Sequence, residues 1–359
     1  MYEFFSDYGL FLAKTITLAI IFVGAIVMII ISASQNKRRA GEGDIEIIHL
    51  NESLTDTSNA LKEAIYDKHA FEQERKAEKK EEKAKAKEAK AKAKQKGASE
   101  EDAEEVQKRV FVLNFDGDIR ASDVESLRET ITAVLSIARP EIDEVVVRLE
   151  SGGGMVHSYG LAASQLSRIT SRNIELTICV DEVAASGGYM MACTADRIIA
   201  APFAIIGSIG VVAQLPNFHR LLKKHDIDFE VLTAGEHKRT LTVFGENTEQ
   251  GRTKFLQDLE ETHTLFKDYV QQQRPELDMS KVANGDVWYG AQALDLGLVD
   301  ELKTSDEYLI EACEEADVYE VNYEFKTGLV DKLGDMVSIA VDRATDRLMT
   351  KAKRSEIER

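Results

Sequence analysis

In its central part the chain alternates short apolar runs with segments whose apolar residues recur at helical spacing. Residues 109–115 (RVFVLNF), 144–149 (EVVVRL) and 176–180 (LTICV) are apolar runs of strand length, and residues 122–138 and 155–169 have helical spacing. Strands that alternate with helices indicate βαβ units. We therefore expect an α/β fold in which helices flank a mainly parallel sheet.

The N-terminal residues show a different pattern. Residues 8–33 form an apolar run that only Lys14 interrupts, close to one end. A helix of about 20 apolar residues crosses the ~30 Å hydrocarbon core of a bilayer. The acidic start of the chain and the basic flank at residues 37–39 argue against a cleaved signal peptide. We expect residues 1–36 to be a retained transmembrane anchor that holds the protein in the lipid bilayer.

The segment after the anchor, residues 37–108, contains a possible short strand at 43–50, a helix at 53–70 and then a charged run. From residue 72 to residue 96 the chain is almost entirely Ala, Lys, Glu, Gln and Arg. Such a composition is typical of a solvated helix or a flexible spacer, although its lysines also suit anionic lipid headgroups.

The globular domain is expected to span residues 109–305. Residues 306–359 would form a C-terminal extension, in which the apolar positions between residues 336 and 348 predict an amphipathic helix.

Composition narrows the function classes. The formal net charge of −18 argues against a nucleic-acid-binding protein, which normally presents a basic face. The three cysteines, Cys179, Cys193 and Cys313, include no Cys-x-x-Cys pair and are expected to be reduced and buried. Basic residues cluster after the predicted anchor, and the positive-inside rule places that flank, with the main domain, in the cytoplasm.

Three glycine-rich turns each follow a predicted strand: residues 151–154 (SGGG), 183–189 (VAASGGY) and 207–210 (GSIG). Glycines let backbone amides point at a ligand, so the first turn suits either a phosphate or an oxyanion. The second turn can expose the hydroxyl of Ser186 as a nucleophile, or Ser186 can simply cap a helix. Because each turn follows a strand, we expect all three at one end of the sheet.

A nucleophilic serine needs a base. The seven histidines show no spacing that favours a triad. Lys238, within TAGEHKRT at residues 233–240, is the other candidate. A lysine acts as a base only where desolvation makes its neutral form accessible, so Lys238 is expected to lie in apolar, largely dry surroundings. The residue pattern alone leaves open that Lys238 is an ordinary solvated lysine.

Three longer segments carry a family resemblance. They are DEVAASGGYMMACTADRIIAAPFAIIGSIGVV (181–212), AGEHKRTLTVFGENT (234–248) and DVWYGAQALDLGLVDEL (286–302). The chain resembles the signal peptide peptidase A family of Ser–Lys proteases, which share the ClpP/crotonase-like fold, over about residues 110–302. The anchor, the spacer and the single domain resemble the inner-membrane peptidase branch of that family. Gly152 stands where the family commonly has proline.

The resemblance implies a membrane-bound serine endopeptidase. Ser186 would attack the peptide carbonyl, and Lys238 would take its proton and pass it to the leaving amine. Ser208 would orient the lysine, and the amides of Gly153 and Gly187 would form the oxyanion hole. No metal or organic cofactor is implied. A homo-oligomer is expected, because members of the family assemble into rings that enclose or complete the sites.

Two other functions stay open at this point: a crotonase-type hydratase or isomerase acting on an acyl thioester, and a non-catalytic membrane scaffold. The paired serine and lysine segments argue against both. The expected substrates are polypeptides, either signal peptides or other membrane-associated or misfolded chains. The expected location is the bacterial inner membrane, with a single span. The charge rule favours a cytoplasmic catalytic domain, whereas the resemblance favours a periplasmic one.

Overall fold

The structure, a computed structural model, describes residues 10, 14, 15, 17, 43–66 and 107–325. The chain divides into two compact units, Ile45–Tyr323 and Met1–Asp44 with Glu324–Arg359. No helix among the described residues is long and apolar enough to span a membrane. The predicted anchor lies almost entirely outside the described residues, and the predicted charged spacer and C-terminal amphipathic helix lie wholly outside them.

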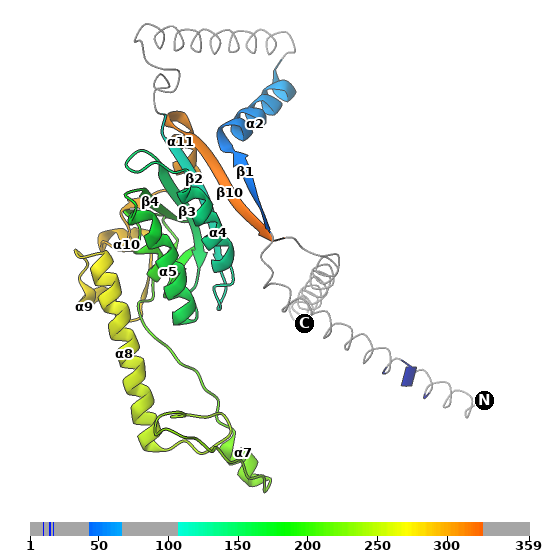
Figure 1. The fold of residues 1–359 in the computed structure, drawn as a ribbon, viewed down its shortest axis with the longest axis vertical. Helices are drawn as coiled ribbons and strands as arrows, with labels where there is room; N and C mark the ends of the chain where they lie inside the picture. Colours follow the sequence, from blue (N-terminus) through cyan, green and yellow to red (C-terminus); the bar gives the residue numbers. More distant parts are fainter. Residues whose placement is uncertain (1–9, 11–13, 16, 18–42, 67–106, 326–359) are drawn as a thin grey trace, which may run out of the picture. The chain divides into compact units, whose positions relative to one another are not determined.

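A mainly parallel sheet runs through the larger unit in the order β1–β10–β2–β3–β4–β6–β9 (Figure 1). A branch of three short strands leaves β3, in which β5 pairs with β3 and β7 in parallel and β8 pairs with β7 in antiparallel. The strands are β1 (Gly43–His49), β2 (Arg109–Gly117), β3 (Glu144–Ser151), β4 (Glu175–Val180), β5 (Val183–Ala185), β6 (Arg197–Ala200), β7 (Ile205–Gly207), β8 (Val287–Tyr289), β9 (Glu301–Leu302) and β10 (Asp317–Phe325). The predicted α/β fold with a mainly parallel sheet is confirmed.

Two cores lie on opposite faces of the sheet, because successive side chains of a strand point to opposite faces. On β2, Phe111 and Leu113 belong to the larger core, whereas Val110 and Val112 belong to the smaller one. Helices α4 (Val124–Leu135) and α5 (Val156–Thr170) contribute their buried apolar residues to the larger core. Helix α11 (Ser305–Glu315) contributes Tyr308 and Leu309 to the smaller core.

The sheet uses chain on both sides of residues 109–305, the predicted extent of the globular domain. Strand β10 follows residue 305 and pairs with β2, and β1 lies beyond β10. Asn51, at the start of helix α2 (Leu50–Ile65), fastens this edge. Its side-chain amide donates to the carbonyls of Cys313 and Ala316 at 2.9 Å each and accepts from the N–H of Val318 at 2.8 Å.

Between β7 and β8 the chain leaves the sheet as an arm, residues 211–273, that extends away from it (Figure 1). The arm contains α7 (His219–Lys224) and the long helix α8 (Glu249–Gln273), of which only Phe266 and Val270 are buried. The remaining helices are α6 (Gly187–Ala192), α9 (Met279–Val282) and α10 (Gly290–Asp295).

A buried ionic cluster lies at the amino ends of the strands. The carboxylate of Asp143, just before β3, contacts Arg109 and Arg139 at 2.6 Å each. Burial opposes ionisation of this carboxyl group, but the hydrogen bonds from Arg139 and Arg109 outweigh it and hold the pKa of Asp143 well below its usual range. Neighbouring Glu144, also buried, accepts a hydrogen bond from Tyr308 of α11. These bonds fix the amino ends of β2 and β3.

Asp143→Asn should lower the free energy of unfolding at pH 7 by about 3 kcal/mol, because it leaves two arginines without their buried counter-charge. The pKa of Asp143 is depressed in the folded state, so its contribution is complete above about pH 4 and is lost as the pH falls further. Denaturant unfolding of both proteins at pH 7 and at pH 3 should therefore show a smaller difference at pH 3.

The matched control is Asp228→Asn. Asp228 pairs with Lys223 at 2.7 Å on the exposed surface of the arm, and this variant should leave the unfolding curve unchanged. An equal loss of stability for Asp143→Asn at both pH values would contradict the charge-based account.

Candidate active site

The strand register brings the three glycine-rich turns together. Ser151 at the end of β3 pairs with Ala184 of β5, and Ala185 pairs with Gly207 of β7. The N–H of Ser186 then donates to the carbonyl of Gly207 at 2.7 Å, which places Ser186 beside the residue that precedes Ser208. The prediction that the three turns gather at one end of the sheet is confirmed.

Ser186 occupies a strained backbone conformation, with φ 53° and ψ −115°. It is half-buried, directly precedes α6, and accepts the N–H of Met190 at 2.9 Å through its carbonyl. A positive φ in a residue other than glycine costs about 1–3 kcal/mol and persists only where the surroundings impose it. The bond to Gly207 on one side and α6 on the other impose it here, as in the strand-to-helix turns that expose nucleophiles.

Gly153 and Gly187 lie against each other beside Ser186. Gly153 has φ +85°, and a Cβ on it would fall 2.6 Å from the nitrogen of Gly187 and 2.8 Å from the Cβ of Ser186. Only glycine permits this approach. Gly187 opens α6, so its N–H has no partner within that helix. The N–H of Gly153 donates to Oγ of Ser151 at 3.1 Å.

Ser208 lies at the same end of the sheet as Ser186. It is half-buried with φ 51°, and its N–H donates to the carbonyl of Asp286 at 2.7 Å. Gly207 before it has φ +102°, and a Cβ there would lie 2.7 Å from the ring of Trp288. The β7–β8 pairing therefore fixes the backbone of Ser208 tightly.

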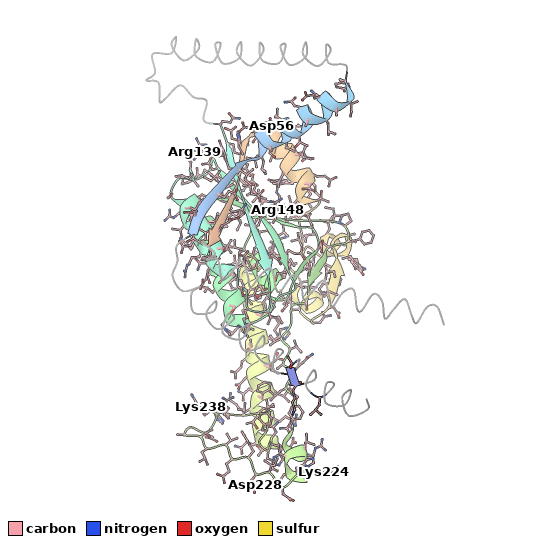
Figure 2. The ribbon with its side chains drawn as sticks, turned by 90° about the vertical axis from the view of Figure 1, so that its right-hand side faces the viewer. Asp56, Arg139, Arg148, Lys224, Asp228 and Lys238 are labelled. Carbon is pink, nitrogen blue, oxygen red and sulfur yellow. The ribbon has the colours of Figure 1, made fainter. Side chains whose placement is uncertain are left out.

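Lys238 does not share these surroundings. It lies in the arm, and Figure 2 shows it in the lower part of the view with Lys224 and Asp228. Its side chain is exposed, and in the described part of the chain its ammonium group makes no hydrogen bond or ion pair. The expectation of apolar, dry surroundings for Lys238 is thus wrong for a single chain, because residues 211–248 lie outside the cores that flank the sheet.

The cysteines are free, with Cys179 and Cys193 buried and Cys313 half-buried. Burial raises the pKa of Cys179 and of Cys193 to about 12, so neither provides a thiolate nucleophile. Within the described ranges, no group of three His, Cys, Asp or Glu side chains is arranged to hold a metal ion.

Sequence reasoning missed Tyr159. Its position suits the apolar face of α5, and it is fully buried, yet its hydroxyl contacts Oγ of Ser151 at 2.6 Å. No sequence signal marks this contact, because it depends on how α5 crosses the end of β3.

The strain at Ser186 predicts how two substitutions at this position change the free energy of unfolding. Ser186→Gly should unfold at a higher denaturant concentration than Ser186→Ala, by about 1 kcal/mol, because glycine adopts a positive φ without steric cost. Ser164, exposed within α5, is the matched control. There the glycine variant should be the less stable of the two by about 1 kcal/mol, since glycine weakens a helix interior. The same order at both sites would contradict strain at Ser186.

Comparison with known proteins assigns the family. Residues 3–166 match the description "Peptidase family S49 N-terminal", and residues 168–319 match "Peptidase family S49". A "Probable protease SohB" of Haemophilus influenzae is 50% identical over 352 residues, which cover 98% of each chain. A "Probable protease SohB" of Buchnera aphidicola subsp. Acyrthosiphon pisum is 53% identical over 226 residues, 63% of this chain and 67% of that protein. "Protease 4" of Haemophilus influenzae is 28% identical over 209 residues, 56% of this chain and 34% of that protein. The chain therefore belongs to peptidase family S49 and is a peptidase of the SohB type.

Proposed function

We propose that the chain is a membrane-bound serine endopeptidase in which Ser186 is the nucleophile and Lys238 the general base. The observation that carries the proposal is the strained Ser186 turn, with Gly153 packed against the N–H of Gly187. The ClpP/crotonase-like fold that the resemblance implies is part of this proposal, supported by the mainly parallel sheet and by glycine turns that follow its strands. No cofactor is needed for this chemistry.

The proposed reaction proceeds through an acyl-enzyme. Lys238 takes the proton of Ser186 as Oγ attacks the peptide carbonyl carbon, and the resulting oxyanion lies against the amides of Gly187 and Gly153. Collapse breaks the C–N bond, and the protonated lysine gives its proton to the leaving amine. Water then hydrolyses the ester. Ser208 orients the lysine through its hydroxyl group.

A second copy of the chain is proposed to bring the lysine and the serine together. The arm exposes many large apolar side chains: Val212, Leu215, Phe218, Leu221, Ile227, Phe229, Val231, Leu232 and Phe244. Phe218 and Phe229 each lie against Phe244, with ring centroids 6.0 Å and 5.6 Å apart, and exposed apolar groups that gather in this way mark protein contacts. Covering by a neighbouring copy would supply the dry surroundings that a neutral lysine needs and would let Lys238 of one copy reach Ser186 of the next. Head-to-tail contacts that repeat in this way close into rings.

Mixing two inactive variants tests this arrangement. Ser186→Ala and Lys238→Ala should each lower kcat for a peptide substrate by at least about 10²-fold, because each removes one half of the dyad. Co-expressed in one cell, they should recover about a quarter of wild-type activity, since random neighbours in a ring pair an intact serine with an intact lysine about one time in four.

His237→Ala is the matched control for Lys238→Ala and should retain activity, because it changes the neighbouring residue without removing the base. Activity that survives Lys238→Ala but not His237→Ala would replace the Ser–Lys assignment with a Ser–His one. Two variants that are inactive alone and stay inactive together, although they co-purify, would place the complete dyad within one chain.

Membrane attachment is proposed from residues 8–33, whose apolar run suits a single span of the bacterial inner membrane. The full-length protein should stay with membranes after alkaline extraction, and a variant without residues 1–36 should be released. Reporter fusions after Lys96 would then show which face of the membrane carries the catalytic domain. Release of the full-length protein by alkali would contradict the anchor. The substrates proposed are signal peptides and other membrane-associated or misfolded polypeptides.

A further inference from the structure

A directed chain of hydrogen bonds ends at the Gly153 turn. The hydroxyl of Tyr159 donates to the carbonyl of Asp118 at 2.7 Å, which commits its only proton. The 2.6 Å contact between Tyr159 and Ser151 must therefore be a bond that Ser151 donates. Oγ of Ser151 in turn accepts the N–H of Gly153 at 3.1 Å. Oγ of Ser151 also lies 3.4 Å from the carbonyl of Gly117, a longer and weaker contact for its proton than the 2.6 Å contact with Tyr159.

Glycines surround this pair of hydroxyl groups. A Cβ on Gly117 would lie 2.3 Å from Oγ of Ser151, and a Cβ on Gly188 would lie 2.4 Å from the carbonyl oxygen of Ser151. A Cβ on Gly187 would lie 2.4 Å from the ring of Tyr159. Backbone from β2 and from the first turn of α6 therefore packs directly on Ser151 and Tyr159, which are 2% and 0% exposed. The same two side chains support both glycine turns beside Ser186.

We propose that Ser151 and Tyr159 are positioning residues that fix the distance between the Gly153 turn and Ser186 and hold the Gly153 amide until the oxyanion forms. This inference rests on the proposed peptidase function. Neither side chain touches the substrate, and both act through the backbone of Gly153 and Gly187.

The amide can pass from one acceptor to the other as charge develops. Its bond to Ser151 joins two neutral groups, whereas a bond to an oxyanion is charge-assisted and about twice as strong. Before attack the N–H of Gly153 donates to Ser151, so the resting site avoids the free-energy cost of an unpaired donor. During attack the oxyanion competes for the same N–H, while the bond from Ser151 to Tyr159 keeps the turn in place. The extra hydrogen-bond strength therefore stabilises mainly the transition state.

Tyr159→Phe in the full-length protein is the decisive variant, because it removes one oxygen and keeps the ring beneath Gly187. It should lower kcat about 10- to 100-fold with KM nearly unchanged, the scale of a small misplacement of an oxyanion donor. Hydrogen exchange measured by mass spectrometry should become faster at residues 150–155. Ser151→Ala should have a similar effect, and the double variant should be little worse than either, since the two residues act as a unit.

Tyr189→Phe is the matched control. Tyr189 is equally buried, but its hydroxyl donates to the carbonyl of Leu298 at 2.9 Å and makes no bond to Ser151. It loses one buried hydroxyl bond where Tyr159→Phe loses two, so its unfolding curve should shift in the same direction by a smaller amount, while kcat and exchange at residues 150–155 stay at wild-type values.

Wild-type kcat in Tyr159→Phe, or an equal loss in Tyr189→Phe, would overturn the positioning role. The exchange measurement separates this failure from failure of the proposed function. If the wild-type protein hydrolyses no peptide, the proposed peptidase reaction is wrong. Faster hydrogen exchange at residues 150–155 in Tyr159→Phe, but not in Tyr189→Phe, would still show that Ser151 and Tyr159 hold the turn. Unchanged exchange would refute the pair's role even in an active enzyme.

Discussion

The hydrogen bond from the N–H of Ser186 to the carbonyl of Gly207 is the constraint on which the site depends. It continues the β5–β7 pairing by one residue past the end of β5, to a position where the chain already has to turn into α6. Ser186 therefore takes a positive φ at the point where the strand ends. Without that bond, only α6 would hold Ser186 in this conformation, and the position of Ser186 beside the Gly153 turn would no longer be fixed by the sheet.

The two ends of the sheet have opposite characters. At the amino ends of the strands, buried carboxylates and arginines satisfy one another and stabilise the fold, as around Asp143. At the carboxyl ends, Ser186 and Ser208 store strain in their positive φ angles, beside the positive φ of Gly153. Strain of this kind needs rigid support. The ionic cluster fixes the amino ends of β2 and β3, and β3 pairs at its carboxyl end with β5, the strand that leads into Ser186. Stability and chemistry thus depend on one sheet but on different residues at its two ends.

Sequence patterns predicted the strands that are buried on both faces, because a short, continuous apolar run such as that of β3 is typical of a strand covered by helices on each side. They missed that β10 belongs to the sheet, since a strand with Asn322 and Glu320 among its residues lacks such a run. For the site, Ser186 and its glycines could be named from the resemblance, and strand register then brought them together. Tyr159 could not be named, because its contact with Ser151 arises from helix packing that no local pattern encodes.

Lys238 illustrates a different limit of prediction from the sequence. Its segment was recognisable, but the surroundings that a general base needs are absent from a single chain, in which the lysine is exposed on the arm. An arm with so many exposed apolar side chains is costly for a free protomer, because water contacts surface that the sheet cannot cover. That cost makes sense if assembly buries the surface. In the proposed mechanism, assembly would complete the catalytic centre by the same contact, so an unassembled chain would have Ser186 in place without Lys238 beside it and could not cleave its neighbours prematurely.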